Sequence, residues 1–99
     1  MKIKHLNLTV ADVVAAREFL EKYFGLTCSG TRGNGFAVMR DNDGFILTLM
    51  KGKEVQYPKT FHVGFPQESE EQVNKINQRL KEDGFLVEAP GGFTIEVMC

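Results

Sequence analysis

The sequence predicts an α+β fold made of two repeated βαβββ modules, of which the second is short by one strand. Two observations support this prediction. Segments about 50 residues apart in the chain resemble each other, which indicates two copies of one supersecondary unit. Within each copy, strand-like alternation gives way to helical spacing and then to alternation again. The matching segments are 3–8 with 60–65, and 44–50 with 92–98.

The first copy is predicted as β-α-β-β-β. Alternating apolar and polar residues predict a strand over 3–10, with its leucines on the buried face. Asp12 is placed to cap a helix whose apolar residues fall at helical spacing and which ends at Gly25. Tight-turn residues then separate three further strands. Those strands are expected at 26–32, 36–40 and 45–51.

The second copy is predicted as β-α-β-β. A strand is expected over 60–65, and a capping box at Ser69 opens a helix that ends at Gly84. Short strands are then expected at 85–88 and 93–98. The whole chain, 1–99, is thus one domain, with module one at 1–51, a polar linker at 52–59 and module two at 60–99.

The length difference between the copies identifies what the second one lacks. From Gly25 to Gly44 is 19 residues, whereas from Gly84 to Gly92 is 8, a deficit of 11 residues. That deficit equals about one strand with its turn at ordinary strand lengths. A missing strand leaves a neighbouring strand with an unpaired edge. We therefore predict a homodimer, formed through an open sheet edge or by exchange of modules.

Composition and charge narrow the classes of partner. The net charge of −1 and the pI near 6.1 give no reason to expect nucleic acid or an anionic membrane as a partner. The apolar run at 45–50 is too short to span a bilayer. The two cysteines, Cys28 and Cys99, lack metal-type spacing, so a reduced cytoplasmic protein with free thiols is predicted.

The two histidines and one glutamate are the candidate metal ligands. His5 and His62 stand at equivalent positions of the repeat, and Glu96 lies in the closing strand of the second copy. If the copies pair about a pseudo-twofold axis, these three side chains and Thr48 converge near its centre. Two imidazoles and a carboxylate form a facial triad that suits Fe, Mn, Ni, Zn or Co and leaves positions open for substrate.

A structural interpretation competes with the metal site. A single histidine on a strand is more often a hydrogen-bonded, half-buried residue than a ligand. A glutamate in an otherwise apolar strand is costly unless it is paired, exposed or bound to metal. The polar residues that share these faces are candidates for the substrate pocket; they are Asn7, Thr9, Thr48 and Thr94.

Three segments of the chain resemble the vicinal oxygen chelate superfamily. They are 5–12, 19–26 and 90–97, and the resemblance extends over nearly the whole chain. That superfamily includes glyoxalase I, extradiol dioxygenases, fosfomycin-resistance enzymes and bleomycin-resistance proteins. The resemblance implies that the paired modules form a cupped mixed sheet with a divalent metal in the cup. It also implies that His5, His62 and Glu96 occupy the metal positions.

Departures from the family pattern shape the functional expectation. Thr48 stands where glyoxalase I carries a glutamate ligand, and the chain has no third histidine of the kind that extradiol dioxygenases use. We expect a metal-dependent enzyme that chelates two neighbouring oxygens of a small substrate, with lyase, isomerase, dioxygenase or thiol-transferase chemistry. The alternatives are a metal-free small-molecule-binding or resistance protein of the same fold, and an inactive shortened variant.

Overall fold

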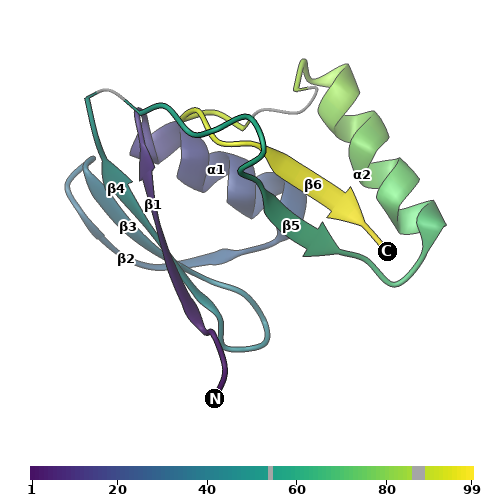
Figure 1. Ribbon diagram of the computed structural model, residues 1–99, viewed down its shortest axis with the longest axis horizontal. Coiled ribbons are helices and arrows are strands. Elements are labelled where there is room, and N and C mark those ends of the chain that lie inside the picture. The colour runs from purple at the N-terminus through teal and green to yellow at the C-terminus, as the bar shows by residue number, and fades with distance from the viewer. Residues whose placement is uncertain (54, 86–88) are drawn as a thin grey trace.

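The computed structural model describes residues 1–53, 55–85 and 89–99. Two helices and six strands follow one another along the chain, in the arrangement that Figure 1 shows. The elements are β1 (His5–Val10), α1 (Val13–Phe24), β2 (Thr27–Arg32), β3 (Phe36–Arg40), β4 (Ile46–Lys51), β5 (Val63–Pro66), α2 (Glu70–Glu82) and β6 (Ile95–Met98). The fold is therefore α+β, as the sequence predicts.

The first unit forms a mixed four-stranded sheet in the order β1-β4-β3-β2. β1 and β4 run parallel, with His5 opposite Ile46, whereas β4, β3 and β2 are antiparallel neighbours. One face of this sheet is apolar, because alternate residues of each strand point to it. Its buried side chains come from three strands; they are Leu8, Val10, Ala37, Met39, Leu47 and Leu49.

Helix α1 covers that apolar face. Asp12 caps the helix, since its carboxylate accepts a hydrogen bond of 3.0 Å from the Ala15 amide. The helix ends where Gly25 adopts a left-handed conformation with φ of 67°, which only glycine adopts without strain. Five of its side chains are buried; they are Val13, Ala16, Phe19, Leu20 and Tyr23. Both predicted boundaries of the helix are confirmed.

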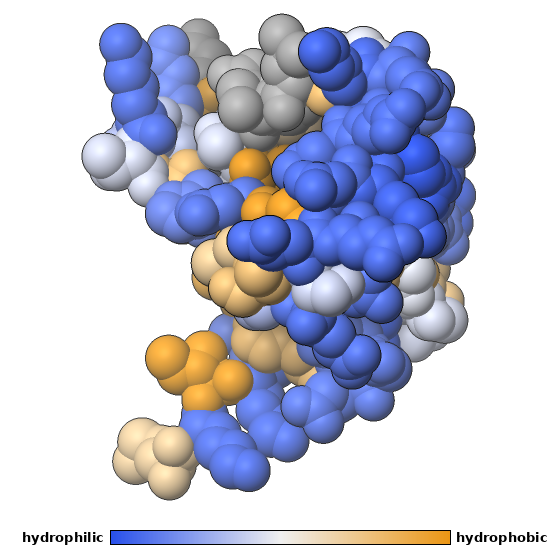
Figure 2. Space-filling model, turned by 90° about the vertical axis from the view of Figure 1, so that its right-hand side faces the viewer, coloured by the Kyte–Doolittle hydropathy of each residue, from blue (hydrophilic) through white to orange (hydrophobic). Residues whose placement is uncertain are grey.

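The second unit is smaller. β5 and β6 form a separate two-stranded parallel sheet with Gly64 opposite Glu96, and α2 lies beside this pair (Figure 1). Ser69 caps α2 by accepting a hydrogen bond of 3.2 Å from the Gln72 amide. Leu80 is the buried residue of this helix. Hydrophilic side chains cover most of the face that Figure 2 shows, and hydrophobic atoms are exposed in its hollow.

Most predicted boundaries agree with the structure, and the main differences are at the starts of β1, β5 and β6. β1 starts at His5 rather than at residue 3. β5 starts at Val63 rather than at residue 60, because the preceding residues form a turn in which the Phe61 amide donates to the Pro58 carbonyl. β6 starts at Ile95 rather than at residue 93. The strand predicted at 85–88 lies mostly outside the described residues, so the predicted repeat of the modules stays a prediction.

Hydrogen bonds, aromatic contacts and a shared hydrophobic core join the two units. The Ala11 amide donates to the Gly91 carbonyl at 3.2 Å, and the rings of Phe24 and Phe65 stack with centroids 3.9 Å apart. A β-carbon on Gly91 would come within 2.8 Å of the Val10 side chain, so only glycine permits this approach. These contacts fix the second unit against the first.

A polar cluster also joins the C-terminal ends of α1 and α2. The Tyr23 hydroxyl donates to the Asp83 carboxylate, and Lys22 forms an ion pair of 3.4 Å with the same group. These two donors lower the pKa of Asp83, the tyrosine hydrogen bond having the larger effect. Burial raises the pKa of Tyr23, and its contact with Asp83 acts in the same direction.

No helix within the described ranges combines the length and the apolar character that a membrane crossing requires.

Candidate metal centre

His62 and Glu96 meet on the outer side of the β5–β6 pair. His62 immediately precedes β5, and Glu96 points from β6 on the side opposite to the buried Ile95. The His62 Nε2 atom lies 2.8 Å from the Glu96 Oε2 atom. The two side chains are 46% and 52% exposed, so a ligand or a metal ion can reach both.

The second nitrogen of the His62 ring also faces an oxygen atom. Its Nδ1 atom lies 2.9 Å from the Thr60 carbonyl oxygen, so both ring nitrogens face oxygen acceptors. A neutral imidazole carries one N–H and satisfies one of them. Both oxygen acceptors are satisfied if the ring is an imidazolium with two N–H donors. Both are also satisfied if a cation lies between Nε2 and the carboxylate while Nδ1–H donates to the Thr60 carbonyl. The latter is the usual arrangement of metal-bound histidines.

His5 belongs to a different hydrogen-bonded group, on the outward face of the first sheet. Its Nε2 atom lies 3.2 Å from the Thr48 hydroxyl oxygen, and that hydroxyl donates to the Asn7 Oδ1 atom at 2.7 Å. Because the hydroxyl proton is used on Asn7, the His5 Nε2–H is the donor to Thr48. The Nδ1 atom of His5 is then the nitrogen that keeps a lone pair.

The predicted convergence of His5, His62, Glu96 and Thr48 is not present within one chain. The structure forms two pairs, His5 with Thr48 and His62 with Glu96. In the described ranges, no three His, Cys, Asp or Glu side chains lie close enough to hold one metal ion. One chain therefore brings together two of the three predicted ligands, and the three-ligand set stays a prediction.

The exposure of Glu96 removes one reason, drawn from the sequence, for expecting a metal ion. Glu96 alternates with buried residues along β6, but its side chain is half exposed. A carboxylate in that position is solvated, so the cost of burying a charge does not by itself demand a metal. The two oxygen acceptors around the His62 ring are the contacts to which a cation site can be related.

The remaining pocket candidates are divided between the two units. Asn7 and Thr48 lie together through their hydrogen bond. Thr94 lies next to the second pair, and its carbonyl accepts a hydrogen bond from the Val63 amide. Thr9 lies at the far end of β1, where both of its backbone groups bind the Tyr57 hydroxyl, at 2.9 and 2.8 Å.

Tyr57 and Gly64 have structural roles in this region that the sequence does not predict. The Tyr57 hydroxyl is used on the Thr9 backbone, which gives this residue a structural role in the linker. Gly64 lies beneath Met98, and a β-carbon there would clash with the Met98 methyl group. In the sequence, the glycine at position 64 of the repeated segment is the feature that could have indicated this close packing.

The sequence of residues 2–96 matches the family described as the Glyoxalase/Bleomycin resistance protein/Dioxygenase superfamily. The chain belongs to this superfamily. The predicted resemblance is thereby confirmed, and the mixed sheet with two helices is the fold that superfamily members share with it.

Solved structures of the glyoxalase superfamily resemble this protein closely. One, described as a possible glyoxalase from Bacillus cereus, is 86% identical, with a TM-score of 0.96, over 100% of this chain and 99% of that one. Another is a mutant fosfomycin resistance protein, FosX, from Listeria monocytogenes, complexed with Mn(II) and 1S,2S-dihydroxypropylphosphonic acid. It is 25% identical, with a TM-score of 0.73, over 88% of this chain and 71% of that one.

A curated relative of this superfamily member is a probable trivalent organoarsenical cleaving enzyme of Bacillus subtilis (strain 168). The two are 29% identical over 86 residues, which is 87% of this chain. The match covers 59% of the relative, so the chain corresponds to little more than half of that protein.

Proposed function

We propose that this superfamily member is a divalent-metal-dependent enzyme whose ion is held by His62 and Glu96 of one chain and by His5. Fe, Mn, Ni, Zn and Co suit such a ligand set. The observation that carries the proposal is the His62 ring, whose two nitrogens face the Glu96 carboxylate and the Thr60 carbonyl. A cation between the ring and the carboxylate satisfies both contacts at once.

The third ligand is proposed to come from a second copy of the chain. β1 is an edge strand that pairs only with β4 among the described strands. The Lys4 and Val10 carbonyls accept hydrogen bonds from the Ile46 and Gly52 amides, on the β4 side of β1. Because backbone groups alternate in direction along a strand, those of the odd-numbered residues of β1 face away from β4. A strand that adds to this edge adjoins His5, which supports a homodimer with one β1 edge beside the second unit of the partner.

A bound divalent ion would act as a Lewis acid toward two neighbouring oxygens of a small substrate. The chain's own contribution is orientation: Thr60 fixes the His62 ring, and Thr48 with Asn7 fixes the His5 ring. The four candidate pocket residues would then contact substrate; they are Asn7, Thr9, Thr48 and Thr94.

The reaction to assay first is cleavage of a trivalent organoarsenical, because the curated relative from Bacillus subtilis is described by that activity. A small phosphonate is the second substrate class to test, because the fosfomycin resistance protein is complexed with Mn(II) and 1S,2S-dihydroxypropylphosphonic acid. A metal-free binding protein of the same fold is the competing function, and the incomplete ligand set of one chain favours it.

Calorimetric titration of Mn(II), Ni(II), Zn(II) and Fe(II) into chelator-stripped protein tests the metal centre. We expect one ion per chain in the wild type and loss of binding in Glu96→Ala. Glu70→Ala is the matched control, because Glu70 is an exposed carboxylate in the first turn of α2. Equal binding by wild type and Glu96→Ala would contradict the proposed ligand set, and no binding by either would favour the metal-free function.

A mixing experiment tests the origin of the third ligand. His5→Ala and His62→Ala are each expected to lose the ion. In a mixed dimer one site regains all three ligands, so random mixing restores about a quarter of the sites in a two-fold symmetric dimer. If the three ligands came from one chain, mixing would restore none.

A further inference from the structure

A cleft of about 610 Å³ opens between the two units, on the α1 side of the first sheet. Its walls include Leu6 and Leu47, which share that side with the buried Leu8 and Leu49. His5, Asn7 and Thr48 point to the opposite side, so the cleft is separate from the candidate metal centre. Its volume lies within the range of pockets that bind small molecules.

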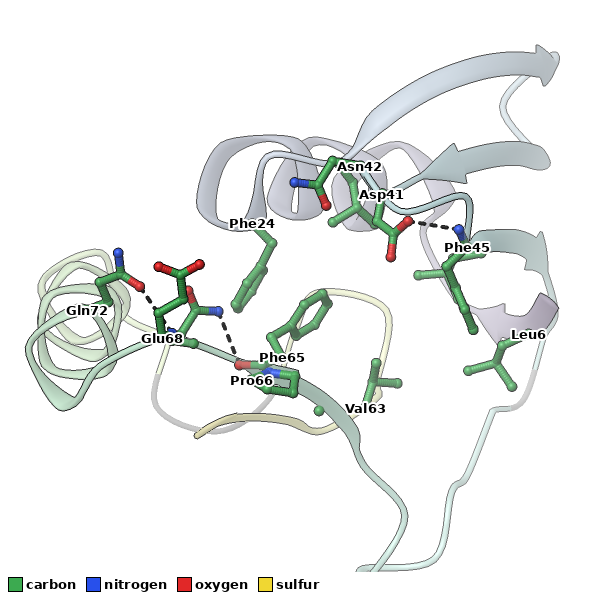
Figure 3. A pocket seen from close by; sticks show the side chains of 14 residues that line it. Leu6, Phe24, Asp41, Asn42, Phe45, Val63, Phe65, Pro66, Glu68 and Gln72 are labelled. Atoms are coloured by element: carbon green, nitrogen blue, oxygen red, sulfur yellow. Dashed lines mark hydrogen bonds between the residues drawn. The ribbon is translucent and has the colours of Figure 1, made fainter. Parts of the chain in front are cut away.

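Aromatic side chains form the apolar wall of the cleft. Phe24 and Phe65 stack at an interplanar angle of 17°, and Phe45 lines the cleft from the turn before β4. Figure 3 shows Phe24 and Phe65 on one side of the hollow, with Phe45 and Leu6 facing them across it. All four side chains are half-buried, so a ligand with an apolar body would remove further apolar surface from water.

The charged groups of the cleft are of one sign. Asp41 and Glu68 line it, and no lysine, arginine or histidine does so in the part of the chain that the structure describes. Figure 3 places Asp41 beside Phe45 and Glu68 beside Phe24 and Gln72. None of the ion pairs found among the described residues involves either carboxylate.

The Asp41 carboxylate is held in place. Its Oδ1 atom accepts hydrogen bonds from the amides of Asp43 and Phe45, at 2.9 and 2.8 Å. The Oδ2 atom is left to meet a ligand. Fixed negative charge next to a low-dielectric aromatic wall attracts cations more strongly than an isolated surface carboxylate does.

We infer that this cleft is a binding site for a small organic cation with an aromatic or branched apolar body. The apolar body lies against Phe24, Phe45 and Phe65, and the cationic head meets Asp41 or Glu68. The absence of lining cations within the described residues disfavours an anionic ligand of the same size. This inference does not depend on the proposed metal centre, because the two sites lie on opposite faces of the sheet.

Titration of three probes of similar size into the ¹⁵N-labelled full chain tests the site. The probes are phenethylammonium, 2-phenylethanol and phenylacetate, and amide chemical shifts report where each one binds. We expect shifts at the cleft residues, with the ammonium bound about tenfold more tightly than the alcohol through one close charge pair. The carboxylate is expected to bind most weakly.

Charge-removing variants separate the acidic groups from the apolar wall. Asp41→Asn keeps an oxygen acceptor for the two backbone amides while it removes the charge, and Glu68→Gln removes the other. In the double variant the ammonium is expected to bind no better than the alcohol. Glu71→Gln is the matched control, because Glu71 pairs with Lys75 outside the cleft and its loss should leave the affinities unchanged.

Three results would overturn the inference. The first is equal affinity for all three probes in the wild type. The second is shifts that map to the His62–Glu96 side or to no defined region. The third is concentration-dependent shifts of the cleft residues without any probe, which would identify a second copy of the chain as the occupant.

Discussion

Helices α1 and α2 have similar lengths but differ greatly in how much they bury. Helix α1 buries five of its side chains against a four-stranded sheet. Helix α2 buries Leu80 and faces a two-stranded sheet. A two-stranded sheet is at best marginally stable unless it packs against a helix or further strands, and α2 contributes one buried side chain to that packing. The first unit therefore carries most of the stability, and the second depends on contacts with it or with another chain.

Core truncation in the two helices should show the largest difference. Leu20 is fully buried in α1, so Leu20→Ala should lower the free energy of unfolding by about 2–5 kcal/mol. Ile76 in α2 is half-buried, and Ile76→Ala should cost about 1 kcal/mol. Urea denaturation measures both. Equal losses would mean that α2 is as well packed as α1.

Hydrogen exchange should show a difference in opening free energy between the two units. This difference should be somewhat smaller than the effect of the core truncation in α1. We expect the amides of α2 and β5 to open with a free energy about 2 kcal/mol below that of α1 and β4, because fewer buried contacts hold them. Native-state exchange followed by NMR gives these values residue by residue. A single common opening energy would show that the units unfold as one cooperative block.

Removal of the Tyr57 hydroxyl tests the connection between the units. Tyr57→Phe keeps the stacked contact with Phe61 but leaves the Thr9 amide and carbonyl without this partner. The expected loss is about 1 kcal/mol, the usual net value of a hydrogen bond. It should be accompanied by faster exchange of the Thr9 amide. Unchanged exchange at Thr9 would contradict the assignment.

The acid dependence of the helix–helix contact should be the smallest effect. The pKa of Asp83 is lowered by its contacts with Tyr23 and Lys22, so the contact stabilises the fold above the unfolded-state pKa near 4. This stabilisation is lost as the pH falls through the lower, folded-state pKa.

Thermal unfolding between roughly pH 2 and 6, which brackets the aspartate range, measures that loss. Asp83→Asn should flatten the acid limb of the profile, whereas Glu18→Gln, at an exposed position of α1, should leave its shape as in the wild type. Identical profiles for wild type and Asp83→Asn would remove the proposed link between the helix ends.

Local signals explain why the sequence predicts the elements well. Asp12 and Gly25 mark the ends of α1 through a hydrogen bond and a backbone angle that involve only neighbouring residues. The irregularity in β2 between Cys28 and Gly30 was not predicted. It depends on pairing with β3, which is not visible in the local pattern of that strand.

The candidate site was predictable only in part, for a related reason. Period-two alternation places His5 with Asn7, and the register of β5 and β6 brings His62 to Glu96. The placement of one pair relative to the other depends on contacts between units, such as the stack of Phe24 on Phe65. Such contacts join residues far apart in the chain, and no periodicity reports them.

The Tyr57 hydroxyl also limits how any strand can add to β1. It binds both backbone groups of Thr9, which a neighbouring strand residue would otherwise pair with. An incoming strand is left with the outward-facing groups of His5 and Asn7. The length of the available edge is thus set by one side chain in the linker, and the alignment of a partner strand is fixed near its start.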